Sequence, residues 1–181
     1  MPDIELSAGS IEYEDTGGHG PVVVLLHGLV TDGSLWRSVV RELRANHRCI
    51  VPTLPLGSHR RPMRVDADLS PRGIGNLQAE FLEKLDLEAV TLVGNDSGLF
   101  QFVAGLHPER LARLVVTSCE AFENFPPGLP GHVVALAAPS ATGSWLDGET
   151  AHSSSNYRCL VAADAHPERD SARSYQVPAC H

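Results

Sequence analysis

Residues 90–98 constrain the fold of this chain more than any other stretch. They read Val-Thr-Leu-Val-Gly-Asn-Asp-Ser-Gly, and a run with helical spacing follows from Leu99 to His107. A β-branched apolar strand that breaks at a Gly-x-Asp-x-Gly turn and continues directly as a helix is typical of the sharp turn that presents a catalytic nucleophile. The sequence therefore places the candidate chemistry at this turn.

The spacing of the glycines indicates which residue stands at the centre of the turn. Strand and helix nearly touch there, so the residues two before and two after the central one must be small. Gly94 and Gly98 meet this requirement around Asp96, whereas a turn centred on Ser97 would put the bulky Leu99 in a crowded position. We predict that the Asp96 carboxylate is the nucleophile and that Ser97 contributes its backbone N–H. Gly, Asn, Asp and Ser are also ordinary loop and helix-cap residues, so this short match needs a second signal.

The second signal lies upstream, at residues 22–26. These five apolar residues do not alternate with polar ones, as expected for a central parallel strand covered on both faces, and they end at His27 and Gly28. The next loop brings the backbone N–H of Leu29 beside the turn, where it and the N–H of Ser97 are predicted to converge on one oxyanion. His27 follows a buried strand directly, so we expect a structural hydrogen-bonding side chain and not a catalytic base.

The remaining elements predict a doubly wound, mostly parallel α/β sheet whose site lies at the carboxyl ends of the strands. Alternating polarity at residues 4–6 and 11–14 predicts two short edge strands, and further buried strands are expected at 49–51 and 111–117. Helical spacing of apolar residues predicts helices over 35–43, 71–85 and 99–107. Ser70 followed by Pro71 predicts the start of the second of these helices.

Composition narrows the class of protein. The chain has 181 residues, 43% of them apolar and 20% charged, which is ordinary for a soluble globular protein. A formal net charge of −8 argues against a nucleic-acid partner, and the arginines near Arg61 are offset by Asp66 and Asp68. The N-terminus lacks a secretory pattern, and no apolar run approaches the roughly 20 residues that span a membrane. We therefore expect a cytoplasmic protein that does not bind membranes.

The cysteines indicate neither disulfides nor a metal site. Cys49, Cys119, Cys159 and Cys180 are far apart and form no C-x-x-C pair, which suggests reduced thiols. The chemistry expected at the turn is complete with side chains and water, so no cofactor is predicted.

From about residue 11 to 130 the chain resembles the α/β-hydrolase superfamily, in particular its aspartate-nucleophile branch, which includes haloalkane dehalogenases and epoxide hydrolases. The residues that carry the resemblance are His27-Gly28, Ser34-Leu35-Trp36-Arg37, Gly94-Asn95-Asp96-Ser97-Gly98 and His107-Pro108-Glu109-Arg110-Leu111.

The resemblance implies a two-step hydrolysis of a small-molecule substrate. Asp96 would displace a halide or open an epoxide to form an ester, and water activated by a histidine would hydrolyse that ester. A further carboxylate would orient the histidine. Glu120 follows the last core strand at a suitable place, although an exposed loop glutamate fits the position equally well.

Departures from the family pattern leave the substrate open among alkyl halides, epoxides and esters. Leu29 and Ser97 stand where dehalogenases commonly carry the Asn and Trp that hold the halide. Val30 stands where epoxide hydrolases usually carry a proline, and no helical cap is evident.

The composition changes abruptly near Pro139. Residues 139–181 contain four large aliphatic side chains with seven Ser and seven Ala, too little apolar surface to offset the entropy of ordering. We therefore predict part of a hydrolase core over 1–138 and a disordered or at most loosely helical tail over 139–181, in a chain truncated relative to the fold. His152, His166 and His181 are poor candidates for the general base, because a mobile tail does not hold a base within reach of its substrate.

Truncation has two expected consequences. The strand at 111–117 becomes an exposed sheet edge that invites self-association. The catalytic histidine, which comes last in the family's chain order, has no clear counterpart. Two functional classes therefore stay open: a hydrolase acting through Asp96, and a catalytically incomplete fragment or non-enzymatic binding module.

Overall fold

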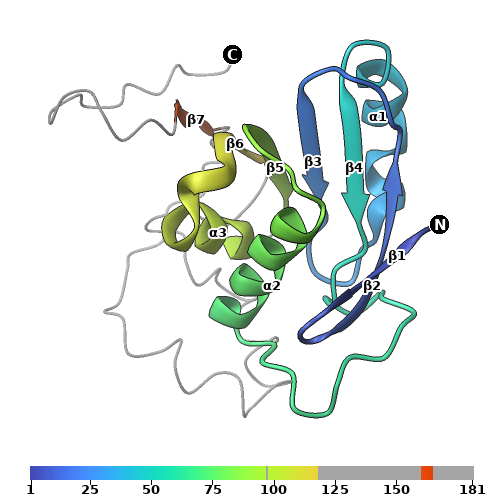
Figure 1. Ribbon diagram of the computed structural model, residues 1–181, viewed down its shortest axis with the longest axis vertical. Coiled ribbons are helices and arrows are strands. Elements are labelled where there is room, and N and C mark those ends of the chain that lie inside the picture. The colour runs from blue at the N-terminus through green and yellow to red at the C-terminus, as the bar shows by residue number, and fades with distance from the viewer. Residues whose placement is uncertain (97, 118–159, 165–181) are drawn as a thin grey trace, which may run out of the picture.

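The computed structural model describes residues 1–96, 98–117 and 160–164, and shows a twisted seven-stranded sheet with helices on both faces (Figure 1). The strands are β1 (Asp3–Leu6), β2 (Gly9–Asp15), β3 (Val22–Leu26), β4 (Arg48–Pro52), β5 (Val90–Asn95), β6 (Leu111–Thr117) and β7 (Leu160–Asp164). The α-helices are α1 (Arg37–Leu43), α2 (Pro71–Lys84) and α3 (Gln101–Leu106), and the short 3₁₀ helices are η1 (Gly33–Trp36), η2 (Gly98–Phe100) and η3 (Pro108–Arg110).

The strand order β1-β2-β4-β3-β5-β6-β7 puts four parallel strands, β4, β3, β5 and β6, in the middle of the sheet. The central position predicted for residues 22–26 is confirmed, since β3 lies between β4 and β5. The prediction of two edge strands holds for β1 alone. β2 pairs antiparallel with β4, with Tyr13 opposite Pro52, and so lies inside the sheet.

β7 corrects two expectations about the C-terminal part of the chain. It pairs antiparallel with β6, with Val115 opposite Val161 and Val116 opposite Leu160. The expected lack of strand structure in the tail is wrong for these five residues, and the expected open edge at β6 is wrong because β6 has a neighbour on each side. The unpaired N–H and C=O groups of β6 offer partners that let a short, weakly patterned segment form a strand. The rest of the predicted tail lies outside the described residues.

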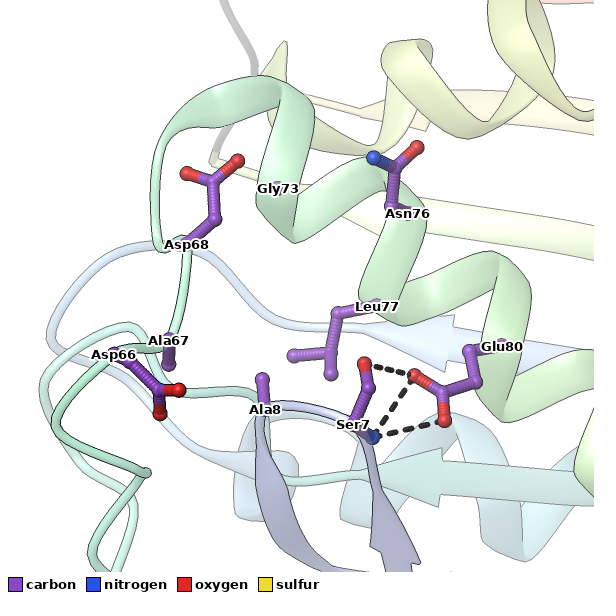
Figure 2. Close-up of a pocket in the computed structure, with 9 residues that line it drawn as sticks. All are labelled: Ser7, Ala8, Asp66, Ala67, Asp68, Gly73, Asn76, Leu77 and Glu80. Atoms are coloured by element: carbon purple, nitrogen blue, oxygen red, sulfur yellow. Dashed lines mark hydrogen bonds between the residues drawn. The ribbon is translucent and has the colours of Figure 1, made fainter.

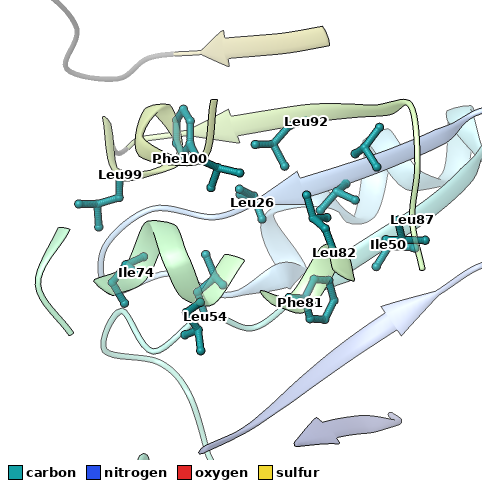
Figure 3. Close-up of a cluster of buried hydrophobic side chains, with 14 of the residues drawn as sticks. Leu26, Ile50, Leu54, Ile74, Phe81, Leu82, Leu87, Leu92, Leu99 and Phe100 are labelled. Carbon is teal, nitrogen blue, oxygen red and sulfur yellow. The ribbon is translucent and has the colours of Figure 1, made fainter. Parts of the chain in front are cut away.

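Alternate residues of the central strands enter two separate cores. Val24 and Leu26 of β3 join the larger core beneath α2 and α3, together with Phe81 and Phe100 (Figure 3). Val23 and Leu25 point to the opposite face, into a smaller core that contains Trp36. Burial on both faces explains why the strand sequence is continuously apolar.

The local sequence signals predicted the start of α2 correctly, but not the structure of residues 35–43. α2 begins as predicted, because the Ser70 hydroxyl accepts a hydrogen bond from the Gly73 N–H (3.1 Å) and Pro71 occupies the first turn. The segment predicted as one helix over 35–43 is η1 followed by α1. Of its five apolar residues only Trp36 is buried, while Leu35 and Val39 are 46% and 38% exposed.

Candidate active site

The turn after β5 holds Asp96 in an unusual backbone conformation. Asp96 has φ = +58° and is exposed. Left-handed backbone costs a non-glycine residue free energy, although Asp tolerates it better than most residues do. Conformations of this kind are concentrated at functional sites. The residue selected from the glycine spacing is thus also the strained residue of the turn, whereas Ser97 lies outside the described residues.

Two glycines let other segments approach the turn closely. A Cβ built on Gly94 would lie 2.3 Å from ring carbons of Phe100, at the start of the following helical segment. A Cβ on Gly28 would lie 2.6 Å from the Asp96 carbonyl oxygen. Because no side chain fits at either position, the loop after β3 and the helical segment after β5 both pack directly on the turn. Gly98 is the first residue of η2.

The end of β6 is hydrogen-bonded to the same turn through Thr117. The Asp96 N–H donates to the Thr117 carbonyl oxygen (3.3 Å). The Asn95 side-chain amide donates to the Thr117 hydroxyl oxygen (2.9 Å), and that hydroxyl donates to the Gly94 carbonyl oxygen (3.2 Å). The sequence analysis did not identify the hydrogen-bonded pair Asn95 and Thr117. The available signal was a polar residue at the end of an otherwise apolar strand.

His27 is completely buried, and both of its ring nitrogens are engaged. The Leu54 N–H donates to Nε2 (2.8 Å), so this nitrogen carries no proton, and Nδ1 donates to the Gly28 carbonyl oxygen (2.9 Å). Burial lowers the pKa of His27 and outweighs the opposing effect of the Gly28 carbonyl. The imidazole is therefore neutral and links the end of β3 to the segment after β4. This is the arrangement expected of a structural side chain.

The loop after His27 and Gly28 holds the backbone N–H that was predicted to bind the oxyanion. The Val30 N–H donates to the Leu56 carbonyl oxygen (2.8 Å), and Val30 has φ = +56°, a marked outlier for a β-branched residue. Within residues 1–96, 98–117 and 160–164, the Leu29 N–H meets no hydrogen-bond acceptor. This N–H follows directly after the glycine that contacts Asp96.

One hollow in the described surface adjoins this loop. It has a volume of about 360 Å³ and is lined by Val30, Thr31, Asp32, Ser34, Leu35 and Ser58. Another, of about 300 Å³, lies beside α2 and contains none of the predicted site residues (Figure 2). Its Glu80 carboxylate already accepts hydrogen bonds from the N–H and hydroxyl of Ser7, at 2.8 Å and 2.5 Å.

We also searched the described part of the chain for a metal site, for reactive cysteines and for membrane-spanning helices. No three His, Cys, Asp or Glu side chains gather there in a way that could hold a metal ion. Cys49 is buried, which raises the pKa of its thiol, and the other three cysteines are outside the described residues. None of the described helices has the length and apolar character needed to cross a bilayer. Glu120, like Ser97, is not among the described residues.

The sheet is mixed, with four adjacent parallel strands at its centre and helices on both faces, and a strained acidic turn follows one of these strands. These features are those of an α/β protein of the hydrolase type. The family model described as "Alpha/beta hydrolase family" matches residues 23–179, and the chain belongs to that family.

Similar proteins include several enzymes of this family. The chain is 29% identical over 131 residues to a haloalkane dehalogenase of Mesorhizobium japonicum, covering 67% of this chain and 41% of that protein. It is 35% identical over 132 residues to a cis-3-alkyl-4-alkyloxetan-2-one decarboxylase of Xanthomonas campestris, covering 67% and 43%. A solved structure of an N-acyl homoserine lactone degrading enzyme shares the fold, with a TM-score of 0.60, 22% identity and coverage of 76% and 51%. The chain thus spans about two fifths of the length of these curated relatives.

Proposed function

We propose that this chain carries the nucleophile half of a hydrolase site, in which Asp96 attacks a small apolar substrate. One observation carries the proposal: an exposed carboxylate stands at the carboxyl end of a central parallel strand, in a left-handed conformation that glycine would adopt without strain. Val30, Asp86 and Ala89 also have positive φ, but Asp96 is the acidic one that directly follows a central parallel strand. This position fits a side chain held up for reaction.

The proposed chemistry has two steps, and both hydrogens of the attacking water leave with the products: on the two hydroxyls of the diol from an epoxide, or on the alcohol and as H⁺ beside the halide. In the first, an Asp96 carboxylate oxygen bonds to an sp³ carbon of the substrate as the carbon–halogen or epoxide C–O bond breaks, and the leaving atom takes the electron pair. In the second, water attacks the carbonyl carbon of the new ester. The backbone N–H groups of Leu29 and Ser97 bind the resulting oxyanion, and departure of the alcohol restores the carboxylate. Glu120 is the proposed orienting acid for the activating histidine.

The surroundings of the turn favour a substrate with an apolar portion. Leu29, Val30 and Leu35 are 37%, 78% and 46% exposed, and the last two line the hollow beside the loop. Clustered exposed aliphatic side chains beside a polar reacting group are typical of sites for small apolar molecules. The dehalogenase and the dialkyl oxetanone decarboxylase among the relatives also have alkyl groups in their named substrates. We therefore favour alkyl halides, epoxides and alkyl-substituted esters, lactones included.

A catalytically incomplete chain, or a binding module, is the second candidate. Both ring nitrogens of His27 are engaged in hydrogen bonds, so His27 offers no free general base.

Intact mass spectrometry after incubation with a bromoalkane, an alkyl epoxide or a β-lactone separates the two candidates, with Asp96→Asn as the matched control. A covalent adduct that is absent from the control supports a live nucleophile without efficient ester hydrolysis. Turnover without an adduct, also lost in the control, supports the complete hydrolase. If no reagent reacts in an Asp96-dependent way, the binding module is the better description.

A further inference from the structure

Thr117, the last residue of β6, is hydrogen-bonded to the nucleophile turn through both its backbone and its side chain. Thr117 uses its carbonyl to accept the Asp96 N–H and its hydroxyl to join Asn95 and Gly94. The Asn95 amide also lies 3.4 Å from the Thr117 carbonyl oxygen. Three consecutive residues of the turn are therefore hydrogen-bonded to one residue of the next strand.

The hydrogen bonds of Thr117 lie at the point where the backbone pairing of β5 and β6 ends. Asn95 is opposite Thr117 in the last register pair of β5 and β6, and both strands end there. Asp96 follows with φ = +58°, a conformation that persists only when surrounding contacts favour it over relaxed alternatives. The hydrogen bond between the Thr117 hydroxyl and the Asn95 amide therefore lies one residue before Asp96, on the side of β5 that faces β6.

We propose that Thr117, acting through Asn95, is a positioning residue that holds Asp96 in its strained conformation and so aims its carboxylate. This inference rests on the proposed role of Asp96 as nucleophile. Thr117 itself does not touch the reacting atoms. Its hydroxyl fixes the Asn95 amide and the Gly94 carbonyl, and these fix the peptide that leads into Asp96.

The variants are Thr117→Val, which keeps the shape but loses the hydroxyl, and Thr117→Ser, which keeps the hydroxyl. Thr91→Val is the matched control, because Thr91 lies on β5 and its hydroxyl has no hydrogen-bond partner among the described residues. Amide hydrogen exchange at Asp96, followed by NMR on the intact chain, reports the turn without any need for activity. We expect exchange about 10-fold faster in Thr117→Val, with little change in the serine variant, in the control and at amides of β3.

The kinetic arm measures the rate of adduct formation at saturating alkyl epoxide. We expect Thr117→Val and Asn95→Ala each to slow it about 10-fold or more, with little change in the half-saturating concentration, and Thr117→Ser to restore it. The double variant should be no slower than either single one, because both changes break the same contact.

The possible failures are distinguishable. If Asp96 exchange in Thr117→Val matches the wild type, or if exchange rises equally across β3, the positioning role is wrong. It is also wrong if exchange rises at Asp96 alone while the adduct forms at an unchanged rate. If the wild type forms no adduct but exchange changes as expected, the proposed function fails, whereas Thr117 still holds the turn.

Discussion

At the residue level, Asp96 carries the conformational cost of a left-handed backbone, as Val30, Asp86 and Ala89 also do. Glycine adopts φ = +58° without penalty, so Asp96→Gly should raise the free energy of unfolding by about 1 kcal/mol. Urea denaturation measures the change. Asp66→Gly, at an exposed aspartate without positive φ, should instead leave stability unchanged or lower it. Equal effects at the two positions would mean that Asp96 is not strained.

The crowding at Gly94 is a second property of individual residues. Gly94→Ala would put a methyl group against the buried Phe100 ring. We therefore expect the free energy of unfolding to fall by about 2 kcal/mol or more. Gly105→Ala in α3 is the matched control, because no described atom outside the backbone of its own helix and its chain neighbours lies within 4 Å of the added Cβ. Alanine has a higher helix propensity than glycine, so the free energy of unfolding of Gly105→Ala should rise by up to about 1 kcal/mol. Thermal unfolding of both variants tests the pair, and a tolerated Gly94→Ala would contradict the packing of helix on strand.

At the scale of elements, His27 links the end of β3 to the segment after β4 and makes stability depend on pH. Its pKa is lower in the folded chain than the ordinary value of about 6.5, so the unfolded chain binds more protons below that value. The stability contributed by neutral His27 is complete above pH 6.5 and is lost as the pH falls from there through the folded-state pKa. Urea denaturation across this range should show the decline in the wild type and a smaller one in His27→Gln. If the free energy of unfolding fell equally with pH in the two proteins, His27 would not be the cause of the decline.

Short-range signals explain which elements could be predicted from the sequence. β3, β4 and α2 matched because an apolar run, a proline and a serine cap act within a few residues. The place of β2 inside the sheet, and the pairing of β7 with β6, depend on partners distant in sequence. The same holds at the site. Glycine spacing singled out Asp96, whereas the contacts of Thr117 and Phe100 could not be read from spacing alone.

At the scale of the whole molecule, β7 closes the edge of the sheet that the sequence predicted to be open. Val161→Pro removes a backbone donor opposite Val115 and should release β7. The exposed β6 would then favour self-association, visible as a sedimentation coefficient that rises with protein concentration more steeply than in the wild type. Identical sedimentation of the two proteins would mean that this pairing does not protect the edge.

Locating the covalent bond that forms during the reaction shows whether the Asp96 carboxylate is the nucleophile. Trypsin should release Asp96 in the peptide from Leu85 to Arg110, which also contains the carboxylates of Asp86, Glu88 and Glu109. After acid quenching of a reaction with an alkyl epoxide, tandem mass spectrometry of this peptide distinguishes the four. We expect an ester on Asp96 alone; an ester on another carboxylate, or on none, would mean that Asp96 is not the nucleophile.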